Sequence, residues 1–197
     1  MASVTLRQYR ESDFEPFYEM NSDPEVMRYF PATLSRQEAL EVFQMVRGKI
    51  ENDGWGVWAV DVNGAFAGFT GLMVPRFAAS FMPCTEILWR FRREYWGRGV
   101  AYSAAIQALA YGFSTLRLNE IVAFTSISNL RSIHLMDRLG FVRDFNGDFN
   151  HPSIPSGHPL RHHVLYRKMP NQLPDPTSPS VTPPAGAGGA PSVAADH

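Results

Sequence analysis

The chain has 197 residues, which is enough for one well-buried domain and too few for two ordinary ones. A formal net charge of -1 and a pI near 6.6 argue against a general binder of nucleic acids or anionic membranes. The single cysteine, Cys84, excludes an intramolecular disulfide framework and a multi-cysteine metal site. No apolar run has the length of a membrane span, and the first residues lack the apolar core of a secretory signal. We therefore expect a cytoplasmic protein. For its oligomeric state we expect a monomer or a homodimer.

The first half of the chain predicts a strand, a helical region and a hairpin. We expect a strand over residues 3–9, one or two short helices over 11–30, a longer helix over 35–52, and strands over 55–62 and 65–74. Ser12 and Ser22 are candidate N-caps of the short helices. Asn63-Gly64 is the dipeptide best suited to a two-residue hairpin turn between the last two strands.

The second half alternates strands with helices. We expect a strand over residues 85–91, a helix from Gly99 to Leu116 with a stripe of small residues, a strand over 119–126, a helix over 129–140, and strands over 141–146 and 161–169. Gly140 ends the second of these helices. This mixed order indicates an α/β sandwich around one sheet.

The last 28 residues, from Pro170 to His197, hold 7 of the 15 prolines and no lysine, arginine or aromatic residue. Such a segment buries too little apolar surface to offset the entropy lost on ordering. We therefore predict a domain over residues 1–169 and a disordered tail over 170–197.

Two glycines lie between the strand at 85–91 and the helix that follows it. Gly97 and Gly99 open the backbone at a helix N-terminus, where free N–H groups and the helix dipole favour an anion. Four basic residues lie within nine positions of one another, as a polyphosphate requires: Arg90, Arg92, Arg93 and Arg98. A tight turn with solvated arginines is the alternative interpretation.

Two familiar phosphate loops do not match this stretch. A P-loop requires Gly-x-x-x-x-Gly-Lys followed by Ser or Thr, and the chain has no Lys-Ser or Lys-Thr pair here. A dinucleotide fold requires a third glycine where Tyr102 stands, and no suitable acidic residue ends the next strand.

The run from Glu94 to Ala101, E-Y-W-G-R-G-V-A, resembles the acetyl-CoA-binding motif of the GNAT superfamily of N-acetyltransferases. Glu94 occupies a position where the general motif has Gln or Arg. Members of the branch that resembles the RimJ/RimL ribosomal-protein acetyltransferases often have Glu at this position, in the run E-Y-W-G-K-G. Asn129-Leu-Arg-Ser132 and the run from Asp137 to Phe141 are similar to the N-x-x-S and K-L-G-F signatures of that branch. The likeness covers essentially the whole domain, with three motifs in the expected order.

The resemblance implies a three-layer α/β sandwich whose mixed central sheet has a V-shaped splay between two parallel strands. Acetyl-CoA would lie in that splay, and its pantetheine arm would pair with the backbone of Leu88, Trp89, Arg90 and Phe91. Its pyrophosphate would bind the amides of Trp96, Gly97, Arg98, Gly99, Val100 and Ala101. Asn129 and Ser132 would contact it from the other side.

Acetyl transfer from a thioester to an amine requires a neutral amine, a stabilised oxyanion and a proton for the departing thiolate. The resemblance assigns the catalytic base to Glu86, whose alternative is an exposed strand carboxylate. A free N–H of the splayed strand, at Trp89, would stabilise the oxyanion. Many family members have a tyrosine where this chain has Met136, so Ser132 is the candidate proton donor; its alternatives are helix packing or a bond to CoA.

Other reactive side chains carry weaker signals. Cys84 lacks an evident activating partner and is interpreted as a bystander thiol. Four of the six histidines lie between His151 and His163, but the adjacent His162 and His163 of a strand point to opposite faces, so no metal site is predicted. Hydrogen bonds in the loop or contacts with the acceptor are the favoured roles of these histidines.

Three functions fit these observations. The first is an acetyl-CoA-dependent N-acetyltransferase that acts on a primary amine, either a protein N-terminus or a small molecule, by direct attack in a ternary complex. The second, for which Met136 leaves room, is a catalytically weak acyl-CoA-binding module or sensor on the same fold. The third is a nucleotide-binding protein of another kind, which the missing phosphate-loop signatures disfavour.

Overall fold

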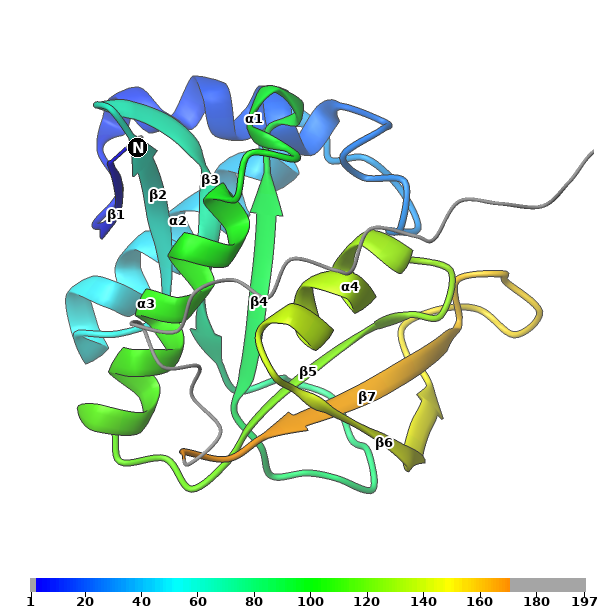
Figure 1. The fold of residues 1–197 in the computed structure, drawn as a ribbon. Helices are drawn as coiled ribbons and strands as arrows, with labels where there is room; N and C mark the ends of the chain where they lie inside the picture. The colour runs from blue at the N-terminus through cyan, green and yellow to red at the C-terminus, as the bar shows by residue number, and fades with distance from the viewer. Residues whose placement is uncertain (1–2, 171–197) are drawn as a thin grey trace, which may run out of the picture.

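Seven strands form one mixed sheet in the order β1-β2-β3-β4-β5-β7-β6 (Figure 1). The computed structural model describes residues 3–170, so all but the first residue of the predicted tail lies outside the described residues. The strands are β1 (Val4–Arg7), β2 (Val57–Val62), β3 (Ala65–Met73), β4 (Glu86–Phe91), β5 (Ile121–Ser126), β6 (Val142–Asn150) and β7 (His162–Lys168). The helices are α1 (Phe14–Ser22), α2 (Arg36–Asp53), α3 (Val100–Ser114) and α4 (Leu130–Arg138), with short 3-10 turns η1 (Glu11–Asp13) and η2 (Arg93–Tyr95).

The helices cover the two faces of the sheet in pairs, which makes three layers (Figure 1). α1 and α2 pack on one face, around Phe17, Phe43 and Phe69. α3 and α4 cover the other face, where Leu109 and Met136 are almost completely buried. This arrangement confirms the predicted α/β sandwich.

Two turns follow the local sequence closely. Asn63 (φ 53°) and Gly64 (φ 90°) both adopt the left-handed conformation that a type I′ hairpin turn requires, and they join β2 to β3 as predicted. Gly140 (φ 75°) follows the C-cap of α4 and ends that helix.

The predicted N-caps of the first helical region are wrong. Ser12 lies inside η1, and Ser22 is the last residue of α1, where its hydroxyl donates to the carbonyl of Glu19. The turn is instead fixed by Asp13, whose carboxylate accepts from the Arg10 amide at 2.7 Å and from the Arg7 guanidinium at 2.6 Å. A buried carboxylate held by an arginine competes better for the turn than a serine hydroxyl does.

The centre of the sheet is split. β4 and β5 are parallel and pair at Glu86 and Val122, beside a hydrogen bond of 2.9 Å from the Val122 amide to the Thr85 carbonyl. Beyond this level β4 continues to pair with β3, and β5 with β7, and no further register pair joins β4 to β5 in the described part of the chain. The two strands therefore diverge, as Figure 1 shows, and form the V-shaped splay.

Candidate active site

The backbone of β4 presents alternate residues to the splay. The amide of Arg92 donates to the carbonyl of Ala67 on the β3 side, while the carbonyl of Phe91 accepts from the Trp96 indole. Because the peptide groups of an antiparallel ladder alternate in direction, Trp89 shares the orientation of Phe91. The N–H of Trp89 therefore points toward the splay and away from β3.

The side chains of β4 alternate in the same way between the two faces of the sheet. Ile87, Trp89 and Phe91 pack on the side of α3 and α4. Leu88 packs in the cluster of α1 and α2, and Arg90 reaches Asn21 at the end of α1. Glu86 shares the face of Leu88 and Arg90 because it lies two residues before Leu88.

The loop between β4 and α3 leaves its amides free. Gly97 (φ 70°) and Gly99 (φ 75°) are both left-handed, which explains why neither position carries a side chain. Gly99 is the N-cap of α3 without a side-chain cap, and within residues 3–170 the amides of Gly97 to Ala101 find no acceptor. A Cβ atom at either glycine would meet nothing within 4 Å, so the loop is open on the side to which a side chain would point. Free amides, a helix dipole and open space together suit a phosphate.

The four arginines near this loop do not converge on it, which corrects the prediction of a polyphosphate cluster. Arg92 pairs with Glu19 at 3.3 Å, and Arg93 approaches Asp23 at 3.8 Å, so both engage the acidic end of α1. Arg90 lies on the opposite face of the sheet because strand alternation takes it there. Arg98, exposed between the two glycines, is the arginine that stands at the free amides.

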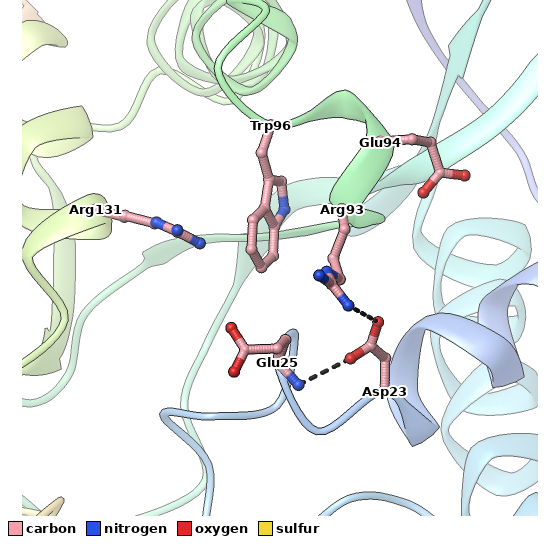
Figure 2. Close-up of a pocket in the computed structure, with 6 residues that line it drawn as sticks. All are labelled: Asp23, Glu25, Arg93, Glu94, Trp96 and Arg131. Carbon is pink, nitrogen blue, oxygen red and sulfur yellow. Dashed lines mark hydrogen bonds and ion pairs between the residues drawn. The ribbon is translucent and has the colours of Figure 1, made fainter.

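A basic residue that the sequence reasoning missed lies across the splay. Arg131 of α4 stacks over the Trp96 ring at 4.5 Å, and the two side chains line an open pocket of about 620 Å³ (Figure 2). Figure 2 shows the Trp96 ring pointing into this pocket between Arg131 and Arg93. Arg131 directly precedes Ser132 in the Asn129–Ser132 motif, and this was the available signal.

The first turn of α4 holds a small polar network. The Ser132 hydroxyl oxygen accepts from the Trp89 indole at 3.2 Å and from the Asn129 side-chain amide at 3.1 Å. Asn129 also donates to the Thr125 hydroxyl and, as N-cap of α4, accepts from the Ser132 amide. The structure thus brings together three predicted site residues, and two accepted bonds leave the Ser132 hydrogen free to be donated.

Glu86 stands at the narrow end of the splay. The residue as a whole is half-buried, and no hydrogen bond or ion pair reaches its carboxylate from the described residues. Burial of the carboxyl group raises its pKa to about 8. A carboxyl group with a pKa near the operating pH is suited to take a proton from an ammonium group.

Cys84 and Met136 lie near the site, and their surroundings give neither of them a role in proton transfer. Burial, followed by the negative charge of Glu86, raises the pKa of the Cys84 thiol to about 11, which keeps it a neutral, weakly reactive thiol. Met136 is 1% exposed and packs in the core between α4 and the sheet. It cannot supply a proton at the position where the resembled family has a tyrosine.

His162 and His163 lie on opposite faces of β7, as predicted. His163 is buried and His162 is exposed. His163 and His151, 5.0 Å apart between ring centroids, join an aromatic cluster with Phe124 and Phe149, and burial lowers the pKa of both imidazoles. Residues 3–170 contain no group of three His, Cys, Asp or Glu side chains arranged to hold a metal ion, and none of their helices is long and apolar enough to cross a membrane.

Known proteins are similar to this chain in sequence and in fold. Residues 3–142 match the family described as "Acetyltransferase (GNAT) domain". The chain is 26% identical over 154 residues to the uncharacterized N-acetyltransferase YnaD of Bacillus subtilis, covering 78% of this chain and 86% of that relative. It is 25% identical over 155 residues to spermidine N(1)-acetyltransferase of Escherichia coli, covering 79% of this chain and 80% of that relative.

Solved structures show the same fold. The GNAT-family acetyltransferase from Bacillus anthracis superposes with a TM-score of 0.69 at 24% identity, covering 86% of this chain and 96% of that one. Spermidine N-acetyltransferase from Vibrio cholerae, in complex with CoA and spermine, superposes with a TM-score of 0.67 at 19% identity and the same coverage. The family match spans well over half of the chain, and the splayed sheet with free amides at α3 is the architecture that the family resemblance implied. The protein therefore belongs to the GNAT family of N-acetyltransferases, which use acetyl-CoA.

Proposed function

We propose that this protein transfers the acetyl group of acetyl-CoA to a primary amine by direct attack in a ternary complex. The observation that carries the proposal is the split sheet: one free backbone edge, an uncapped helix N-terminus and an unpaired carboxyl group all lie around the same opening. The three motifs also support the RimJ/RimL-like branch.

The cofactor-binding residues are proposed from the open geometry of the splay. The amides from Gly97 to Ala101 would hold the pyrophosphate, with Arg98 beside them and Arg131 across the splay. The Trp96 amide, which the sequence also assigned to the pyrophosphate, donates instead to the Arg93 carbonyl at 3.0 Å. The backbone groups of Trp89 and the amide of Phe91 would pair with the pantetheine arm, because they face away from β3. The backbone groups of Leu88 and Arg90, which the sequence also assigned to this arm, face β3, and the Phe91 carbonyl accepts from the Trp96 indole. Asn129 would contact that arm from α4.

The reaction would proceed in one covalent exchange. The amine nitrogen attacks the thioester carbonyl carbon, the new C–N bond forms, and the Trp89 N–H stabilises the oxyanion. Before the attack, Glu86 would have accepted one proton from the acceptor ammonium group, directly or through water. The C–S bond then breaks, the thiolate takes the hydroxyl proton of Ser132, and Ser132 regains a proton from the acetylated nitrogen, which leaves a neutral acetamide, the CoA thiol and a protonated Glu86.

The proposal is tested by thiol release from acetyl-CoA with a panel of amines, followed by mass spectrometry of the products. The panel contains polyamines, amino acids, simple alkylamines and peptides with free N-termini. We expect acetyl-CoA-dependent thiol release with at least one class and an acetamide product. Tight acetyl-CoA binding without release across the panel would favour the sensor interpretation instead.

A further inference from the structure

A second cavity lies on the face of the sheet that α1 and α2 cover. Its volume is about 410 Å³, which is in the range of small-molecule sites. Its walls are mainly apolar and come from the segment after α1, from α2 and from the sheet, including Met27, Phe30, Leu34, Val46, Phe69 and Leu88. Leu88 and Arg90 of β4 line it, so the cavity opens on the same strand face as Glu86.

Arg90 is the basic residue that lines this cavity, and it has no carboxylate partner in the part of the chain that the structure describes. Its guanidinium donates one hydrogen bond to the neutral side-chain oxygen of Asn21 and stacks over Phe30 at 4.0 Å and Phe69 at 5.3 Å. Its Nε atom is buried and finds no acceptor among residues 3–170. Burial lowers the Arg90 pKa to about 10, which still leaves it charged at neutral pH.

The ionisable groups around Arg90 do not supply the missing charge. Glu38 lines the cavity and is ionised, but its carboxylate accepts from the amide and hydroxyl of Ser35, and no ion pair joins it to Arg90 among residues 3–170. Asp13 is held by Arg7 at 2.6 Å. The Tyr9 hydroxyl is buried and finds no hydrogen-bond partner within residues 3–170, and burial raises its pKa, which keeps it neutral.

A partly buried cation without a carboxylate partner is costly, and an anion that enters the cavity would offset that cost. Guanidinium binds carboxylates through paired hydrogen bonds, and Arg90 keeps several donors unused. A polycation in the same cavity would instead be repelled. The cavity thus favours a ligand with an apolar body and one anionic group.

We propose that the acceptor amine is amino-acid-like: an apolar body lies in this cavity, a carboxylate pairs with Arg90, and the amino group points toward Trp89 and Glu86. The inference rests on the proposed acetyl transfer and names its substrate class. Glu86 and Arg90 are four residues apart on one strand, about 13 Å between Cα atoms, and both side chains lie on the face that carries Leu88. An acceptor that engages both must span part of this distance, so the number of bonds between its amine and its carboxylate matters.

The test compares acceptors that differ only in the carboxylate. L-Phenylalanine is paired with 2-phenylethylamine and L-leucine with 3-methylbutylamine, and a second arm uses ω-amino acids to place the carboxylate further from the amine. Turnover is measured by thiol release, and binding by calorimetry with unacetylated CoA present. We expect the wild-type protein to favour the carboxylated partner about 10- to 100-fold, the scale of hydrogen bonds to a charged group.

Arg90→Met removes the charge at nearly constant length and should abolish this preference, while Arg90→Lys should keep part of it. Arg36→Met is the matched control, because Arg36 also stacks on aromatic rings but is exposed and paired with Glu15. It should leave the preference unchanged. A wild-type protein that binds the decarboxylated amines as well or better, or an Arg90→Met variant that keeps the preference, would overturn the proposal.

The two proposals fail in different ways. Carboxylate-dependent binding without thiol release would contradict acetyl transfer and uphold the ligand class. Transfer to polyamines or simple alkylamines, with no preference for a carboxylate, would uphold acetyl transfer and overturn the ligand class.

Discussion

The carboxyl group of Glu86 sets the pH dependence that we expect of the reaction. Its pKa of about 8 leaves only about a tenth of the groups ionised at pH 7. The wild-type kcat should therefore rise with pH and level off above about pH 8. Glu86→Gln should lower kcat about 10- to 1,000-fold at pH 8 with little change in acetyl-CoA affinity, because it removes the base and keeps the shape.

Thiol-release rates between pH 6 and pH 10 check this expectation. The loss should shrink at the alkaline end, where the amine arrives already neutral. Glu51→Gln is the control, because Glu51 is an exposed residue of α2 paired with Arg47. Equal turnover of Glu86→Gln and wild type at pH 8 would remove Glu86 from the mechanism.

Ser132 has a role that can be separated from helix packing. Ser132→Ala removes the acceptor of both the Trp89 indole and the Asn129 amide, so we expect a stability loss of about 1–3 kcal/mol. It also removes the proposed proton donor, and kcat should fall about 10- to 1,000-fold. Ser132→Thr keeps the hydroxyl and should retain most activity.

An acetyl thioester of an acidic aromatic thiol supplies the discriminating measurement. Its thiolate leaves without a proton, so the Ser132→Ala variant should lose much less rate on it than on acetyl-CoA. Equal losses on the two thioesters would mean that Ser132 serves only structure.

The identity of a residue predicts its chemical role better than it predicts where its side chain points. Asn129 and Ser132 were singled out from a motif, and the structure places them together beside Trp89. The orientation of Arg90 could have been read from strand alternation, since it is one residue from Trp89. The lack of a carboxylate partner for Arg90 among the described residues could not be predicted from the sequence. It depends on where α1 ends, because that places the neutral side chain of Asn21 beside the guanidinium.

At the scale of elements, the loop before α3 allows the stability cost of a left-handed residue to be measured separately from its effect on acetyl-CoA binding. Gly99 and Gly54 share the same geometry: φ is 75° and 74°, and a Cβ atom at either would meet nothing within 4 Å. Glutamate at either position should cost about 1–2 kcal/mol of stability, because both require the left-handed conformation. Only Gly99→Glu should abolish acetyl-CoA binding, because it alone places a carboxylate before the free amides of α3.

Thermal melting and calorimetry of the two variants measure both effects. Equal acetyl-CoA affinity of Gly99→Glu and Gly54→Glu would show that the phosphates bind elsewhere. Binding to the wild-type protein should also weaken as salt is added, because charges are paired in the complex.

Element order was predictable because its signals are local. The hairpin at Asn63-Gly64 and the end of α4 at Gly140 follow from the dihedral angles that these residues favour. The start of α1 was mispredicted because the Arg7–Asp13 ion pair, a tertiary contact with the first strand, determines it. The splay follows from the family resemblance and not from periodicity, since both strands read as ordinary buried strands.

At the scale of the whole molecule, Glu86 lowers stability where it is ionised. Its folded-state pKa of about 8 lies above the ordinary value of 4.5, so the folded protein holds a proton that the unfolded chain releases between these values. Its contribution to stability therefore falls as pH rises from about 4.5 to about 8. Glu86→Gln should match wild type at pH 4 and melt at a higher temperature at pH 9, and Glu51→Gln should not. A Glu86→Gln variant that melts below wild type at pH 9 would contradict the raised pKa.

The split between β4 and β5 places two strand edges in the middle of a sheet, facing each other. Exposed edges are normally templates for unwanted pairing with another chain. An inserted strand, however, must keep about 4.8 Å from each neighbour along its whole length, and diverging edges offer that spacing on both sides at one level only. A polypeptide strand therefore cannot pair with both edges along its length, whereas a slender chain with a few polar groups can enter. The divergence that creates the splay thus also prevents unwanted strand pairing at the centre of the sheet.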